Sequence, residues 1–85
     1  MERPKVYTAG ESCVQCKATE RKMDELGIDR EVISLADVDP DQIEEWRNND
    51  LKTAPIVEAN GETWSGFRPD KIGALAIVLA REGIE

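Results

Sequence analysis

The chain has 85 residues, with 18 acidic against 11 basic side chains, a formal net charge of -7 and no histidine. A chain of this length has room for one small core, so we expect residues 1–85 to form a single domain. The negative charge repels a phosphate backbone, which argues against nucleic acid as a partner. The lack of histidine removes the commonest general base and metal ligand, so any chemistry falls to the thiols.

No segment of the sequence predicts export or membrane insertion. The first residues run directly into the strand-like Val6-Tyr7-Thr8, without the apolar stretch of a signal peptide. No apolar run approaches the roughly 18 residues that a membrane-spanning helix needs. We therefore expect a cytoplasmic protein that does not associate with a membrane.

The first third of the chain predicts a strand, a helix and a second strand. Residues 4–8 are typical of a buried strand, and Cys16, Thr19, Met23 and Leu26 then recur at helical spacing. Gly27 predicts the end of this helix in a left-handed C-cap. Residues 30–35 predict another strand. Because a helix connects the two strands, we expect them to pair in parallel through a right-handed crossover.

The remaining residues predict a helix, a hairpin and a last helix. Asp39 and Pro40 have the character of an N-cap and a first helical residue, and Ile43 and Trp46 give this helix an apolar side. Strands at 55–59 and 62–64 flank Asn60-Gly61, which favours a tight antiparallel hairpin. The last helix begins near Pro69-Asp70, carries an apolar stripe and ends at Gly83; the stripe consists of Ile72, Leu75, Ala76 and Leu79. The fold class is therefore α/β, with the order β-α-β-α-β-β-α and a mixed four-stranded sheet flanked by three helices.

The only two cysteines stand in the sequence Cys13-Val14-Gln15-Cys16 and allow three interpretations. A structural disulfide this short closes almost no loop and removes little chain entropy. A zinc site needs four ligands, which this chain could supply only by pairing with a second copy or by adding carboxylates. A C-x-x-C after the first strand of a βαβ unit is the usual signature of a redox pair. We therefore favour a working dithiol with no bound metal or cofactor.

The position of the motif assigns a role to each thiol. At the start of a helix Cys13 faces unpaired backbone N–H groups and the positive end of the helix dipole, which stabilise a thiolate. Cys16 lies one turn further along and can reach Cys13. We expect Cys13 to attack a partner disulfide and Cys16 to resolve the mixed disulfide.

The C-x-x-C motif, Thr53-Ala54-Pro55 and the run Trp64–Asp70 together resemble the NrdH redoxins over nearly the whole chain. This resemblance implies a glutaredoxin-like sequence on a thioredoxin-like fold, and a cytosolic hydrogen donor to class Ib ribonucleotide reductase. It also implies reduction by thioredoxin reductase, with NADPH as the indirect electron source, and a monomer. The residues that it assigns to partner binding are Val14, Gln15, Thr53, Ala54, Pro55, Trp64, Ser65, Gly66, Phe67 and Arg68.

Within this frame the resemblance favours a cis peptide bond before Pro55, with the backbone of Ala54 beside Cys13 and available to a partner strand. We expect Trp64 to be partly structural and Phe67 to lie at the docking surface. Arg68 stands where glutathione-using glutaredoxins have an acidic residue for the γ-glutamyl amine, which argues against glutathione. Arg68 could contact a partner directly, or it could hold the loop at the start of the last helix by hydrogen bonds, and both interpretations remain open.

One residue departs from the family pattern. Glu11 stands in the loop before Cys13, where the family usually has a basic residue, and its charge would raise the pKa of the Cys13 thiol. Ser12 is an alternative cap for the helix. Three other functions remain open: a glutathione-dependent glutaredoxin, an iron-sulfur or zinc carrier formed by two chains, and an interaction module with inert thiols.

Overall fold

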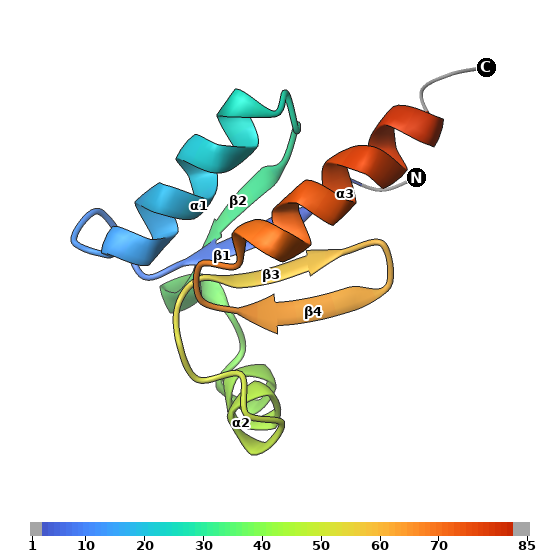
Figure 1. Cartoon of the computed structure of the whole chain (residues 1–85). Coiled ribbons are helices and arrows are strands. Elements are labelled where there is room, and N and C mark those ends of the chain that lie inside the picture. The colour runs from blue at the N-terminus through green and yellow to red at the C-terminus, as the bar shows by residue number, and fades with distance from the viewer. Residues whose placement is uncertain (1–2, 83–85) are drawn as a thin grey trace.

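The computed structural model describes residues 3–82 and has a four-stranded sheet in the order β2-β1-β3-β4. The elements follow one another as β1 (Lys5–Thr8), α1 (Val14–Glu25), β2 (Glu31–Ser34), the short 3-10 helix η1 (Leu35–Asp37), α2 (Pro40–Asn48), β3 (Ile56–Ala59), β4 (Glu62–Ser65) and α3 (Pro69–Glu82). Helices α1 and α3 lie on one face of the sheet and α2 lies on the other (Figure 1). No helix in this part of the chain is long and apolar enough to cross a membrane.

The predicted element order and pairing directions are confirmed. Strands β1 and β2 are parallel, and β3 is antiparallel to both β1 and β4. The hairpin turns at Asn60 and Gly61, whose φ angles of 51° and 78° are the positive values that the Asn-Gly pair predicts. The predicted end of the last helix at Gly83 lies outside the described residues.

Helix α1 ends as predicted, but Leu26 near its end is not buried as expected. Gly27 has a φ of 69°, its N–H donates to the carbonyl of Asp24, and the N–H of Ile28 donates to the carbonyl of Met23 at 2.9 Å. These two hydrogen bonds form a Schellman C-cap, which buries Ile28 against the core. Leu26 was expected on the buried stripe and is instead 40% exposed, because it is the cap residue and its backbone has already left the helical conformation.

The main core lies between the sheet and the pair α1 and α3. It contains residues from α1, α3, three of the strands and the loop before β2, namely Val6, Met23, Ile28, Val57, Ala59, Trp64, Ile72 and Leu75. The predicted stripe of α3 supplies Ile72 and Leu75 to this core, and Ala76 and Leu79 pack against it. This packing fixes the start of α1 against the sheet, where the cysteines lie.

A smaller contact holds α2 on the opposite face. Asp39 caps the helix by accepting the N–H of Asp41 at 2.9 Å, as the Asp-Pro start predicts. The buried ring of Trp46 packs against Tyr7 of β1, with ring centroids 4.8 Å apart. The Tyr7 hydroxyl donates to the carboxylate of Glu58 at 2.8 Å. Burial, together with this hydrogen bond and the negative charge of Glu58, raises the pKa of Tyr7 to about 12.

Because Tyr7 is the only tyrosine, its ionisation can be followed directly by tyrosinate absorbance. We expect a midpoint near 12 in the native protein and near 10 in denaturant. A raised native pKa means that the stability linked to Tyr7 is complete below about pH 10 and is lost as the pH rises toward 12. Glu58→Gln, which removes the charge, should lower the native midpoint. An unshifted native midpoint would contradict the partly buried hydrogen bond from Tyr7 to Glu58.

Candidate active site

The two cysteines form a disulfide at the start of α1, where Cys13 is the N-cap residue. The N–H of Cys16 donates to Cys13 Sγ at 3.2 Å, so the sulfur takes the place that a serine or aspartate oxygen usually has in a cap. The alternative assignment of Ser12 as the cap is therefore wrong. Cys13 is partly exposed, whereas Cys16 is only 1% exposed. A large partner can approach the first sulfur and not the second.

The electrostatics at Cys13 favour the ionised sulfur once the disulfide opens. The backbone N–H of Cys16 points at Sγ, and the positive end of the α1 dipole adds to its effect. Glu11 acts in the opposite direction, but its side chain is exposed in the preceding turn, where water and salt screen its charge. A reduced Cys13 therefore has the surroundings of a nucleophile.

The loop 53–55 lies against the same sulfur. The Ala54–Pro55 peptide bond is cis, as the family resemblance favours, and the Ala54 carbonyl oxygen lies 3.9 Å from Cys13 Sγ. The N–H of Gly66 donates to the carbonyls of both Thr53 and Pro55, at 3.0 and 2.8 Å. The loop is thereby fastened to the segment that joins β4 to α3.

Gln15 connects the cysteine motif to that segment as well. Its Oε1 accepts the N–H of Phe67 at 2.9 Å, across 52 positions of sequence. Gly66 leaves room for this contact, because a Cβ atom there would lie 3.0 Å from Gln15 Oε1 and 3.7 Å from Thr53 Cγ2. The family resemblance assigns Gln15 to partner binding and gives no sign of this internal role.

Arg68 is occupied by its neighbour at the start of α3. Its guanidinium binds the Asp70 carboxylate through two contacts, Nε to Oδ1 at 3.2 Å and Nη2 to Oδ2 at 3.0 Å. Hydrogen bonding from Arg68 lowers the pKa of Asp70, and the pKa of Arg68 is raised in return. The Arg68 carbonyl also accepts the N–H of Ile72 at 3.0 Å. Of the two interpretations of Arg68, these contacts favour the one in which it holds the start of the helix.

The side chains around the disulfide differ in how much surface they offer. Val14 is 79% exposed, next to Cys13. Phe67 is partly buried and packs on the core edge, and Ser65 is partly exposed. Trp64 was expected to be partly structural; it is 4% exposed and belongs wholly to the core, so its ring presents no surface to a partner. Val14, next to Cys13 in the sequence, and the partly buried Phe67, whose N–H binds Gln15, therefore offer apolar surface at this site.

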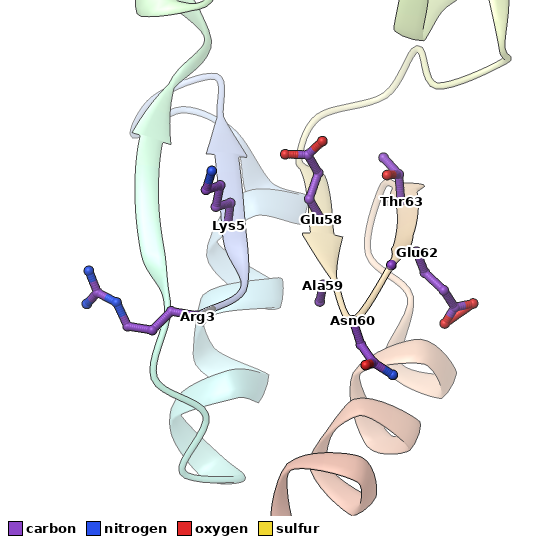
Figure 2. Close-up of a pocket in the computed structure, with 8 residues that line it drawn as sticks. Arg3, Lys5, Glu58, Ala59, Asn60, Glu62 and Thr63 are labelled. Atoms are coloured by element: carbon purple, nitrogen blue, oxygen red, sulfur yellow. The ribbon is translucent and has the colours of Figure 1, made fainter. Parts of the chain in front are cut away.

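Two hollows mark the sheet face that carries α2. The larger, of about 380 Å³, lies around the β3–β4 turn and the beginning of β1, lined by polar residues such as Lys5, Glu58 and Thr63 (Figure 2). That end of the sheet is opposite to the cysteines, which follow the other end of β1. The smaller hollow, of about 160 Å³, lies between α2 and β3 and includes Ala54 among its lining residues. Of these two hollows, the smaller therefore adjoins the candidate active site.

The fit between Gly66 and Gln15 can be tested by comparing two glycines with similar backbone angles. Gly66 and Gly27 have φ angles of 79° and 69°, but a Cβ at Gly27 meets no atom within 4 Å. Alanine at either position should cost about 1 kcal/mol for the backbone conformation. Gly66→Ala should cost about 0.5–1.5 kcal/mol more, because it displaces Gln15 from Phe67.

Urea unfolding of the oxidised protein measures this difference. In a Gln15→Ala background the excess cost of Gly66→Ala over Gly27→Ala should largely disappear, since the contact is already lost. Equal costs for the two glycine variants in the native background would contradict a tight fit at Gly66.

Comparison with known proteins agrees with this geometry. The glutaredoxin family model matches residues 5–64. The glutaredoxin-like protein NrdH of Escherichia coli K12 is 43% identical over 70 residues, covering 82% of this chain and 84% of the relative. The corresponding protein of Salmonella typhimurium is 40% identical over the same coverage.

Solved structures give the same result. The E. coli NrdH-redoxin, described as glutaredoxin-like with a thioredoxin-like activity profile, matches with a TM-score of 0.74 and 42% identity over 87% of this chain and 95% of its own. A glutaredoxin from Archaeoglobus fulgidus shares the fold, with a TM-score of 0.66 at 22% identity over 88% and 86% of the two chains. A thioredoxin-like fold with a C-x-x-C disulfide at the start of its first helix is thus combined with a sequence of this family. The chain belongs to the glutaredoxin family and, within it, to the glutaredoxin-like NrdH redox proteins.

Proposed function

We propose that this protein is a dithiol electron donor that reduces the active-site disulfide of class Ib ribonucleotide reductase and is itself reduced by thioredoxin reductase. The observation that carries the proposal is the Cys13–Cys16 disulfide, capped by the Cys16 N–H and placed beside the Ala54 carbonyl, in a chain 43% identical to NrdH. We also propose that it works in the cytoplasm as a monomer, without a bound metal or cofactor.

The proposed reaction is two successive thiol-disulfide exchanges. The Cys13 thiolate attacks one sulfur of the partner disulfide, forms a mixed disulfide and releases the other partner sulfur as a thiolate. Cys16, as a thiolate, then attacks Cys13 Sγ, forms the Cys13–Cys16 bond and releases the second partner sulfur. Two electrons pass to the partner, and with two protons they convert its disulfide into two thiols. Thioredoxin reductase returns the pair to the dithiol with electrons from NADPH.

Accessibility supports this order of attack. Cys13 is the partly exposed sulfur, and Cys16 is almost fully buried beneath it. The cap hydrogen bond from the Cys16 N–H favours negative charge on Cys13 Sγ, which makes this sulfur the attacking thiolate. Only a small movement of the Cys16 side chain is needed for resolution, because the two sulfurs are already bonded in the oxidised protein.

The surroundings of the sulfur support a protein rather than glutathione as the partner. A partner segment lying along loop 53–55 would present its cysteine to Cys13 while pairing its main chain with the backbone near Ala54. Val14 and Phe67 add apolar surface near the motif. At the corner before α3, the carboxylate of Asp70 is held by Arg68 and the N–H of Phe67 is held by Gln15. The γ-glutamyl end of glutathione would therefore have to displace existing contacts.

NADPH consumption by the oxidised protein tests this proposal. We expect turnover with bacterial thioredoxin reductase and none with glutathione plus glutathione reductase. Cys13→Ser should abolish turnover, because the attacking sulfur is lost. With Cys16→Ser the reaction should stop at a mixed disulfide between Cys13 and the partner protein, because the thiol that resolves it is missing. Mass spectrometry detects this species. The reduced protein should then support ribonucleotide reduction by the class Ib enzyme.

Each alternative function predicts a different result in these assays. Turnover driven by glutathione alone would identify a glutathione-dependent glutaredoxin. Colour, bound metal or a metal-dependent dimer would point to the carrier formed by two chains. A biological activity that survives Cys13→Ser would point to an interaction module with inert thiols.

A further inference from the structure

Thr19 presents an unexplained polar group in the interior of α1. It lies one turn after Cys16 on the buried face of the helix, between Cys16 and Met23, and is 0% exposed. Its hydroxyl has no hydrogen-bond partner in the described structure. A threonine inside a helix commonly bonds a carbonyl of the preceding turn, and this one does not. Its hydroxyl thus carries a desolvation penalty that no contact of the oxidised protein offsets.

Helix geometry directs this hydroxyl toward the cysteine pair. Residues three apart on a helix are surface neighbours, and helical side chains lean toward the N-terminal end. The side chain of Thr19 therefore leans over the turn that carries Cys16. Both side chains are shielded from water, with exposed fractions of 0% for Thr19 and 1% for Cys16. In this dry setting a hydrogen bond to a charged sulfur is stronger than at the surface.

The redox state of Cys16 decides whether such a bond forms. A disulfide sulfur is a poor acceptor, and Cys16 Sγ is held toward Cys13 by the covalent bond. Two electrons and two protons convert the disulfide into two thiols, free the Cys16 sulfur to rotate, and allow it to become a thiolate. A thiolate is a strong acceptor for a hydroxyl within reach.

We infer that Thr19 is a positioning residue, whose hydroxyl donates a hydrogen bond to the Cys16 sulfur in the reduced protein. The bond stabilises the reduced pair relative to the disulfide and favours the Cys16 thiolate that attacks Cys13. During that attack the proton stays on the Thr19 oxygen, and the electron pair leaves on the partner sulfur. The hydroxyl loses its acceptor when the disulfide closes, which is the state seen in the structure.

The equilibrium with a small dithiol tests this inference without any protein partner, so a failure of the proposed partner assignment would not affect the outcome. The wild type, Thr19→Val and Thr19→Ser are equilibrated in dithiothreitol buffers, and the oxidised fraction is measured after acid trapping. Thr19→Val keeps the shape and removes the donor, and should shift the equilibrium constant about tenfold toward the disulfide, equivalent to about 30 mV for two electrons. Thr19→Ser keeps the donor and should stay near wild type. Thr63→Val, at an exposed threonine of β4, should leave the equilibrium unchanged.

Two further measurements separate this role from simple packing. Thr19→Val should leave the oxidised form as stable as wild type or more stable, and should destabilise only the reduced form. In a Cys13→Ser background, Thr19→Val should move the pH profile of Cys16 alkylation to higher pH. Thr19→Ala also removes the hydroxyl and replaces Thr19→Val in these measurements if the valine variant does not fold. An unchanged dithiothreitol equilibrium, or equal destabilisation of both redox forms, would overturn the inference.

Discussion

The hydrogen bond from the Cys16 N–H to Cys13 Sγ is the interaction on which the chemistry of this protein depends. A sulfur replaces the usual oxygen at the N-cap of α1, so the same contact that begins the helix also stabilises charge on the reacting atom. The contact requires the first turn of α1 to keep its place. That place is set by the main core, in which Met23 and Ile28 pack against Val6 and the stripe of α3.

Backbone contacts from distant segments complete the site around that sulfur. Gly66 bonds the carbonyls on both sides of Ala54, and Gln15 bonds the backbone of Phe67, so three separate segments are held together. The side chain of Gln15 and the ion pair of Arg68 with Asp70 satisfy polar groups at the corner before α3. The surface beside Cys13 includes the Ala54 backbone and the exposed side chain of Val14. Such a surface suits an extended segment of a protein better than a small charged peptide.

Features fixed by local chemistry could be predicted from the sequence, and features fixed by distant contacts could not. The turn at Asn60-Gly61, the cap at Asp39 and the C-cap at Gly27 each depend on a few adjacent residues, and all three are confirmed. The role of Gln15 depends on a backbone group 52 positions away, which no local pattern records. Trp64 lies in the edge strand β4 directly after the exposed Thr63, so the local sequence does not show that its side chain is buried. Its exposure of only 4% results from packing against the residues of α3 in the main core. The sequence allows two roles for Arg68, and the contacts of its guanidinium with the Asp70 carboxylate favour the one at the helix start.

The proposed chemistry depends on Cys13, at the helix start, acting as the nucleophile. Alkylation of the fully reduced protein as a function of pH, with the modified residue identified by mass spectrometry, tests it most directly. We expect Cys13 to be modified first, with a reactivity that rises at a pH below the pKa of about 8.5 of an ordinary cysteine. Preferential modification of Cys16, or a Cys13 that reacts only above that pH, would contradict it.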